Sequence, residues 1–160
     1  MPGRSEAWWN EPYRPGKWQR RQVLGHLIDS ASNNHQRFVR ALIQDAYDGP
    51  AYDQEGCVRV ERFDLASMDV LIALFCSYNR LLSHVVANFP PEKLGTICRV
   101  GTYPEMTLEE LAIDYVAHLE HHLTQIFGTS WQAAEKRLRP NWPPYSGIVR
   151  RACSSASVKK

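Results

Sequence analysis

The sequence lacks the features that mark several large classes of protein. Its four cysteines include no Cys-x-x-Cys pair, which argues against a zinc ribbon or a redox dithiol and is typical of free thiols in a reducing compartment. No uninterrupted apolar run is long enough to predict a membrane span, and the first residues lack the pattern of a secretory signal. The formal net charge of +2 gives no electrostatic footprint for nucleic acid. We therefore expect a cytoplasmic protein with neither a membrane nor a nucleic acid as its partner.

What the chain does have is enough apolar material for one hydrophobic core. Its 160 residues are 44% hydrophobic and include five tryptophans, a composition that suits one globular domain. We divide the chain into a proline-rich N-terminal segment (residues 1–17), a single helical domain (residues 18–149) and a basic, serine-rich tail (residues 150–160). The tail is expected to be disordered, because it carries few apolar side chains.

Two long segments have the periodicity of amphipathic helices. Apolar side chains recur at steps of three and four over residues 18–44, and again over residues 68–89, which two prolines follow. Residues 51–62, between these segments, are polar and contain scattered turn formers. We predict two long helices joined by a loop with short extended pieces.

A third helix is predicted from its ends as well as from its stripe. Thr107 and Glu110 form the pattern of a capping box, in which each side chain accepts a hydrogen bond from the other residue's backbone N–H. The apolar stripe that follows runs to about Phe127, and Gly128 can supply the left-handed C-cap. Three helices of this length predict an all-α protein with an antiparallel, up-down bundle.

Two histidines occupy positions on the apolar stripe of this third helix. His118 and His122 are four residues apart, so their side chains lie on one face and both can reach one metal ion. His26, near the start of the first long helix, could supply a third ligand and leave a coordination position open. His121 could replace His122, although it lies off the stripe. The alternative is that these histidines are hydrogen-bonded core residues that hold no metal.

Polar residues at helical spacing from these histidines are candidates for supporting roles. Asp29 and Asp114 are three residues after and four residues before candidate ligands, spacings that suit a carboxylate that orients a histidine ring. Ser30, Asn33 and Arg37 lie on the same side of the first helix as its histidine and could contact a bound small molecule. The alternative for all of them is an exposed position on the helix surface.

Two separated blocks of the sequence resemble the DinB-like superfamily. The first block is Lys17-Trp18 followed by Val-Leu-Gly-His26-Leu-Ile-Asp29 and by Asn33-Asn34-His35-Gln-Arg37-Phe38. The second is Thr107-Leu-Glu-Glu-Leu leading into His118-Leu-Glu-His121-His122. The resemblance covers about residues 17–127 and has both blocks in the family's order.

The resemblance implies a four-helix bundle, often dimeric, that holds a divalent metal ion through His26, His118 and His122. Zinc and nickel are the metals expected first. The family includes thiol-dependent S-transferases, which use a low-molecular-weight thiol as cosubstrate, and hydrolases. A small-molecule substrate is therefore expected, with either reaction. A bundle that binds a ligand or a protein partner without catalysis is the alternative.

The N-terminal part departs from the family's pattern. Members carry a full helix before the Lys-Trp block, whereas only residues 1–17 precede it here. We expect this first family helix to be missing or stunted, which would leave an apolar groove along the bundle. Residues 131–149 contain Trp131, Leu138 and Trp142 and are expected to form a C-terminal extension that covers the groove. A second subunit, as in a homodimer, is the alternative cover.

Overall fold

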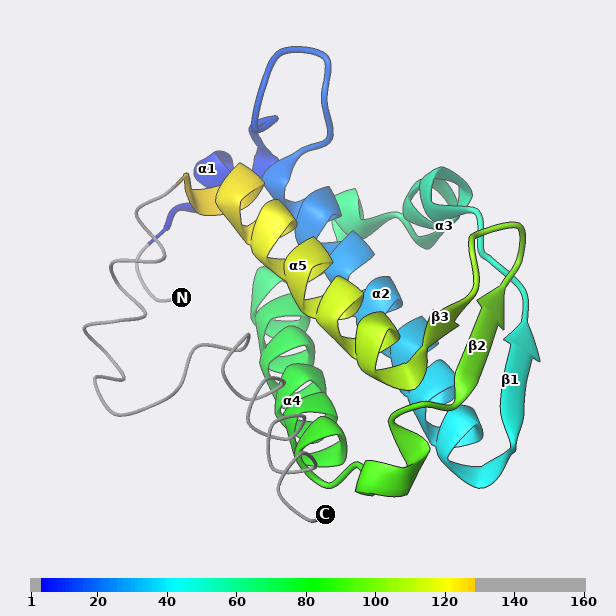
Figure 1. Cartoon of the computed structure of the whole chain (residues 1–160). Coiled ribbons are helices and arrows are strands. Elements are labelled where there is room, and N and C mark those ends of the chain that lie inside the picture. Colours follow the sequence, from blue (N-terminus) through cyan, green and yellow to red (C-terminus); the bar gives the residue numbers. More distant parts are fainter. Residues whose placement is uncertain (1–3, 129–160) are drawn as a thin grey trace.

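The computed structural model describes residues 4–128, most of which are helical (Figure 1). Three long helices form the bundle: α2 (Arg20–Ile43), α4 (Met68–Ala87) and α5 (Leu108–Phe127). The shorter helices are α1 (Glu6–Asn10), α3 (Gln54–Glu61), and the 3₁₀ helices η1 (Phe63–Leu65) and η2 (Pro91–Lys93). The predicted helical-bundle class is confirmed. Residues 129–160 lie outside the described part, and with them the predicted C-terminal extension and tail.

Helix α2 is the centre of the bundle, because both other long helices pack against it. Its side chains at steps of three and four are fully buried, among them Leu24, Leu27, Ala31 and Phe38. Each fully buried leucine or phenylalanine contributes about 1.5–3 kcal/mol relative to an exposed position. In Figure 1, α5 runs along α2 in the opposite direction. The predicted apolar stripes therefore form the interfaces that hold these helices together.

The ends of α5 are those that its sequence predicts. The Thr107 hydroxyl oxygen accepts from the backbone N–H of Glu110 at 3.2 Å, and the Glu110 carboxylate accepts from the backbone N–H of Thr107 at 2.7 Å. At the other end Gly128, with φ of 66°, is the C-cap residue. Because these caps satisfy backbone groups that the helix itself leaves unpaired, they fix where α5 begins and ends.

A small sheet lies at one end of the bundle, beside the start of α5 (Figure 1). Strand β1 (Ala46–Gly49) pairs in parallel with β2 (Ile97–Val100), which pairs antiparallel with β3 (Met106–Thr107). This sheet was not predicted, because its longest strands have only four residues and their pairing joins distant segments.

Helix α3 lies in the segment that we predicted to be a loop, so that prediction was wrong. The Asp53 carboxylate caps the helix by accepting from the backbone N–H of Gly56 at 2.9 Å. Only Gly56 and Val58 of this eight-residue helix are buried. A helix this short with so little buried apolar surface shows no stripe in its sequence.

The N-terminal helix α1 is one short turn, as the stunted first helix of the prediction requires. The Ser5 hydroxyl caps it by accepting from the backbone N–H of Trp8 at 3.2 Å. Trp9 is 2% exposed, and the ring of Trp8 stacks on Phe127 with centroids 5.7 Å apart. The turn therefore covers the end of α5 and adds to the core.

Among the described helices, α4 is long and apolar enough to cross a membrane by length and composition. In this fold it packs along α2, and a polar residue, Asn79, is buried in its middle. The Tyr115 hydroxyl donates to the side-chain oxygen of Asn79 at 2.6 Å. The opposite side of α4 exposes Val70, Leu74 and Leu81. The helix therefore has one face in the bundle and one apolar face that no described residue covers.

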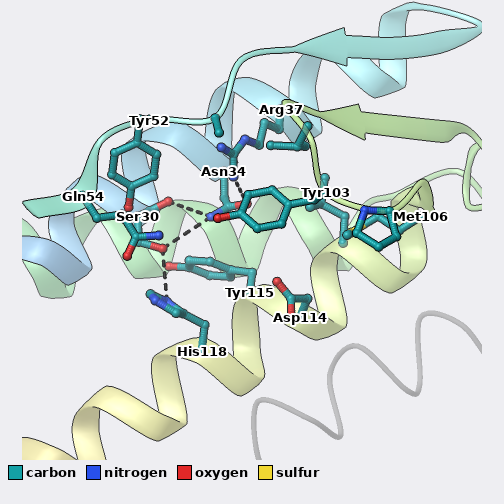
Figure 2. Close-up of a pocket in the computed structure, with 14 residues that line it drawn as sticks. Ser30, Asn34, Arg37, Tyr52, Gln54, Tyr103, Met106, Asp114, Tyr115 and His118 are labelled. Carbon is teal, nitrogen blue, oxygen red and sulfur yellow. Dashed lines mark hydrogen bonds between the residues drawn. The ribbon is translucent and has the colours of Figure 1, made fainter.

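A cavity of about 350 Å³ lies between α2, α5 and the segments that flank the sheet (Figure 2). Helix α2 contributes Ser30, Asn34 and Arg37, and α5 contributes Leu111, Asp114, Tyr115 and His118. The remaining walls are Ala51, Tyr52, Gln54, Val100, Tyr103, Pro104 and Met106. The bundle and the loops beside the sheet thus enclose a space of the size that small ligands occupy.

Candidate metal centre

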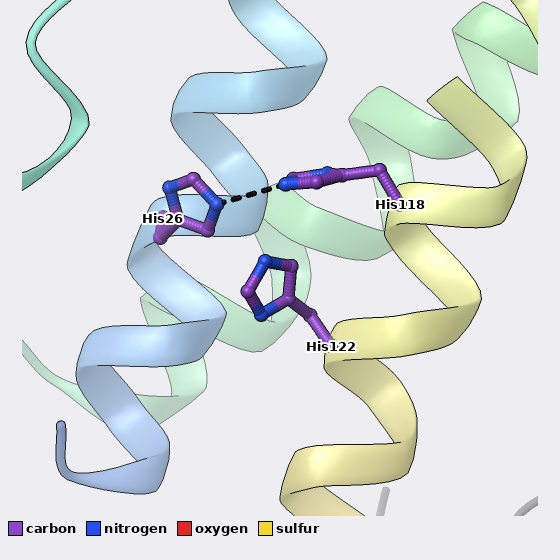
Figure 3. A group of neighbouring side chains, drawn as sticks. All are labelled: His26, His118 and His122. Carbon is purple, nitrogen blue, oxygen red and sulfur yellow. Dashed lines mark hydrogen bonds between the residues drawn. The ribbon is translucent and has the colours of Figure 1, made fainter. Parts of the chain in front are cut away.

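Three histidines converge beside this cavity (Figure 3). His26 extends from α2, and His118 and His122 extend from successive turns of α5. One ring nitrogen from each lies within 4.8 Å of those of the other two. The closest pair is Nε2 of His26 and Nε2 of His118, 3.1 Å apart. The structure thus brings together the three histidines that the sequence analysis selected.

The antiparallel packing of α2 and α5 explains why the histidines meet. His26 lies in the second turn of α2, and the other two lie in the C-terminal half of α5, where that helix passes the start of α2. The buried side chains Leu27, Leu119 and Leu123 surround this crossing. His26 itself is 0% exposed. The apolar core therefore fixes the helices so that these rings must face one another.

The histidines are neutral at pH 7. Burial, together with the neighbouring His122 and His118, lowers the pKa of His26 from 6.5 to about 3. Burial, together with His122 and His121, lowers the pKa of His118 to about 4. The pKa of His122 is also lowered, mainly by burial, although a hydrogen bond to Gln125 opposes the shift. Neutral imidazoles have the free lone pair that a metal requires.

Hydrogen bonds hold two of the three rings. Nδ1 of His122 lies 2.8 Å from Oε1 of Gln125, which as an acceptor places the proton on Nδ1 and leaves Nε2 with its lone pair. Nδ1 of His118 lies 3.4 Å from the Ser30 hydroxyl. Within residues 4–128, Nδ1 of His26 is buried and has no partner. The rings of His122 and His118 are therefore oriented by side chains at their outer nitrogens.

This donor set fits a divalent metal ion. Two nitrogens bound to one zinc at 2.0–2.1 Å in a tetrahedral arrangement lie about 3.3 Å apart. The 3.1 Å between the nitrogens of His26 and His118 is close to that separation. Three neutral histidines are also the ligand set of catalytic zinc sites that keep one position open. His121 is exposed, and its Nε2 lies 2.8 Å from the Gln125 amide nitrogen, so it does not join the group.

Asp29 does not contact the histidines. It lies with Cys57 and Glu61 of α3, and one ligand atom from each of the three is within 4.8 Å of the others. Burial, together with the neighbouring Glu61, raises the pKa of the Asp29 carboxyl from 3.8 to about 7. Three residues correspond to about 300° of helical rotation, so Asp29 lies about 60° around α2 from His26, on the side where Cys57 and Glu61 of α3 approach it. Asp29 therefore lies beside Cys57 and Glu61, and not beside a histidine ring as its spacing from His26 suggested.

Of the three residues predicted to contact a ligand, Ser30 and Arg37 line the cavity, whereas Asn33 donates from its side chain to the backbone oxygen of Asp29 at 3.0 Å. Asp114, predicted to orient a histidine ring, also lies in the cavity wall. Asn34 takes the place of Asn33 in the cavity wall. The cavity lies to one side of the His26 direction on α2, and a position seven residues on falls about 20° to the other side.

Other residues of the site were not predicted. Tyr52 and Tyr103 reach the cavity from loops, where no periodic pattern marks them. Burial raises the pKa of Tyr52 to about 12, so its hydroxyl stays protonated and can donate a hydrogen bond. Gln125 was also missed, although its position three residues after His122 is a helical spacing that could have indicated its role.

Known proteins are similar to this chain in sequence. A protein of Oceanobacillus iheyensis named "Putative metal-dependent hydrolase" is 41% identical over 117 residues, which are 73% of this chain and 67% of that protein. A Bacillus subtilis protein with the same name, YfiT, is 27% identical over 116 residues, which are 72% of this chain and 65% of YfiT. The chain spans about two thirds of the length of these curated relatives.

The solved structures give the same result for the fold. The structure of YfiT, described as "a probable metal-dependent hydrolase with an unusual four-helix bundle topology", matches with a TM-score of 0.69 and 26% identity. The match covers 82% of this chain and 75% of that one. The family model for the DinB superfamily matches residues 3–126, nearly all of the described part and more than the two blocks that first suggested the resemblance. On sequence and fold together, the chain belongs to the DinB superfamily.

Proposed function

We propose that this chain is a metal-dependent enzyme of the hydrolase type, which binds one divalent ion, zinc or nickel, through His26, His118 and His122. The observation that carries the proposal is the convergence of three neutral imidazoles, one of which, that of His118, lines a cavity. The names of the relatives from Oceanobacillus iheyensis and Bacillus subtilis support it, since both describe metal-dependent hydrolases.

The surrounding residues suit this role. A bound divalent ion supplies Lewis-acid chemistry, which polarises an electrophile and lowers the pKa of a nucleophile at the open position. Gln125 and Ser30 hold the rings of His122 and His118 at their outer nitrogens. The buried interface of α2 and α5 limits the access of water and keeps the imidazoles neutral. Tyr52 offers a protonated hydroxyl to a substrate oxygen in the cavity.

The nucleophile and the partners belong to the same proposal. The cavity suits a small-molecule substrate. Water is the nucleophile of a hydrolase, and a low-molecular-weight thiol as cosubstrate would use the same open position for transfer. We also propose a cytoplasmic location, with no nucleic acid and no membrane as partner.

Elemental analysis of the purified, untagged protein after reconstitution with zinc or nickel tests the metal site. Wild type is expected to hold about one ion per chain, and His118→Ala and His122→Ala are expected to lose it, because two imidazoles rarely hold a metal alone. The matched control is His121→Ala, which changes an exposed histidine on the same turn and should retain the ion.

Either of two results would contradict the proposal. If wild type binds no ion, the alternative of a ligand-binding bundle without catalysis is favoured. If His122→Ala holds as much metal as wild type, the assigned ligand set is wrong. When the ion is present, hydrolysis of small ester and amide substrates should disappear after chelation and return with the metal.

A further inference from the structure

We propose that the cavity beside the histidines binds a small organic anion, with its carboxylate held by Arg37 and its apolar body against the neighbouring tyrosines. The inference rests on the proposed function, because it assigns the cavity to the substrate of that site. It adds a chemical class of substrate and names the residue that selects it.

Arg37 is a buried cation without a counter-charge. Its side chain is in the cavity wall, and the residue is only 9% exposed. No aspartate or glutamate within residues 4–128 forms an ion pair with it. Its hydrogen bond in this part of the chain runs from Nη1 to the side-chain oxygen of Asn34, at 3.4 Å. A guanidinium has five N–H donors, so most of its donors are left for a ligand.

Two other arginines on α2 form ion pairs with carboxylates of the same chain. Arg21 is 3% exposed, pairs with the Glu6 carboxylate and donates to the backbone oxygen of Asp64 at 2.7 Å. Arg20 pairs with Glu11 at 3.3 Å. A buried charge is costly unless it is paired, and these side chains have acidic partners. The cation in the cavity wall lacks one, which points to a ligand as its partner.

The charges of the cavity favour a carboxylate over a phosphate. Among the lining residues Arg37 is the one fixed cation, and Asp114, which is exposed, is the one carboxylate. This balance suits a single negative charge, whereas a phosphate dianion usually requires several donors or cations. Guanidinium and carboxylate groups are also planar and form two parallel hydrogen bonds.

The other walls suit an apolar body of modest size. Tyr103, Met106, Leu111 and Tyr115 also line the cavity. In Figure 2, Tyr103 and Tyr115 lie between Arg37 and His118. A volume of about 350 Å³ is near the lower end of the range for small-molecule sites. Aromatic rings and aliphatic side chains offer contact area to an aryl or short alkyl group. The cavity therefore matches a small arylalkyl or alkyl acid.

The arginine and the histidines lie at opposite ends of one row of polar groups (Figure 2). Arg37 donates to Asn34 at 3.4 Å, Asn34 donates to the Ser30 backbone oxygen at 2.9 Å, and the Ser30 hydroxyl lies 3.4 Å from His118. The α-carbons of His26 and Arg37, eleven residues apart on α2, are separated by a rise of about 16 Å. A ligand anchored by its carboxylate would thus present a bond several atoms away to the histidine end.

The test compares an acid with its neutral isostere. We would titrate 3-phenylpropionate and 3-phenylpropionamide into the full-length protein by isothermal calorimetry, after dialysis against a chelator so that no metal can bind the carboxylate. Wild type is expected to bind the acid about tenfold or more tightly than the amide, as charge-assisted hydrogen bonds allow. Arg37→Gln should lose this preference, and Arg37→Lys should retain part of it.

Arg40→Gln is the matched control, since Arg40 is an exposed arginine three residues further along the same helix. It should keep the full preference. Equal binding of acid and amide by wild type, binding of neither, or a preference that survives in Arg37→Gln would overturn the inference. Tighter binding of 2-phenylethyl phosphate than of the acid would overturn the choice of carboxylate. If Arg37→Gln fails to fold, as judged by circular dichroism, the inference is still tested by two measurements. These are the ratio of the acid and amide affinities in wild type, and the same ratio in Arg37→Lys.

Zinc binding separates this inference from the proposed function. His122→Ala, which changes a histidine that does not line the cavity, should lose zinc but keep its preference for the acid in the presence of chelator. Arg37→Gln should show the reverse, with zinc retained and the preference lost. If wild type binds no zinc yet prefers the acid tenfold, the proposed function fails and the anion site stands. If zinc binds normally and the acid has no advantage, the anion site fails alone.

Discussion

His26 and His118 make the metal-free protein sensitive to acid. Their pKa values in the folded state are about 3 and about 4, whereas the ordinary value is 6.5. Between these values the unfolded chain binds more protons than the folded one, so the free energy of unfolding falls as the pH falls below 6.5. The two histidines together contribute a loss of about 4 kcal/mol between about pH 7 and pH 5, and the opposite shift of Asp29 offsets about half of it. We therefore expect a net loss of about 2 kcal/mol, measured by urea unfolding in the presence of a chelator.

Two substitutions separate the contributions to this pH dependence. His26→Gln removes one depressed pKa and should flatten the decline. Asp29 acts in the opposite sense, because its pKa is raised from 3.8 to about 7 and the folded state holds the extra proton across that interval. Asp29→Asn should therefore make the loss of stability on acidification steeper. Stability that is constant from about pH 7 to pH 5 in wild type and in both variants would contradict these assignments.

Site residues could be predicted from the sequence where the spacing along one helix alone determines which side chains share a face. His118 and His122 share a face because they are four residues apart, and any α-helix places them together. His26 was proposed from its place near the start of the first long helix and was supported by the family resemblance, because no local spacing relates α2 to α5. Asn33 was selected where Asn34 lines the cavity, because spacing gives a direction to within tens of degrees but not the side on which a loop packs.

At the scale of elements, α2 and η1 meet at a glycine. A β-carbon on Gly25 would lie 2.2 Å from a ring atom of Phe63, which is 6% exposed. Gly25→Ala must therefore displace the ring. We expect a net destabilisation of about 1–2 kcal/mol, because overpacking costs 1–3 kcal/mol while alanine regains about 1 kcal/mol of helix propensity.

Thermal unfolding of Gly25→Ala beside Gly95→Ala measures this contact. Gly95 is exposed, and a β-carbon there would meet no atom within 4 Å, so its substitution should change stability little. Gly25 is adjacent to His26, and its variant should also weaken zinc binding if α2 shifts to admit the extra carbon. A Gly25→Ala protein as stable as wild type would show that η1 does not approach α2 this closely.

The elements that were predicted are those whose cause lies in their own local sequence. α2, α4 and α5 were found to within a few residues because each carries its own stripe and stop signals. The sheet pairs β1 with β2, which is some fifty residues away in the sequence. A short stretch of sequence therefore does not show that these strands pair. α3 depends on the Asp53 cap and two buried residues, too little for a periodic signal.

For the whole molecule, the open question is what covers the outer side of the bundle. Val70 and Leu74 of α4 and Ile113 of α5 are 61%, 46% and 46% exposed. The chain leaves α5 after Phe127, which packs on the same apolar cluster as Ile72 of α4. The residues that follow Gly128 lie outside the described part, and they contain Trp131 and Trp142, which we expect from the sequence to cover an exposed apolar face.

Deletion of residues 129–160 tests whether this segment, rather than a second subunit, is the cover. We expect the shortened protein to melt at least 4 °C lower, a shift that corresponds to roughly 1–2 kcal/mol in a chain of this size, and to self-associate through the uncovered face. Calorimetry and light scattering over a range of concentrations measure both effects. If wild type is already a homodimer and the deletion leaves both its dimerisation and its melting temperature unchanged, the second subunit is the cover. The segment would then lie elsewhere, because burial of these exposed side chains cannot be removed without loss of stability.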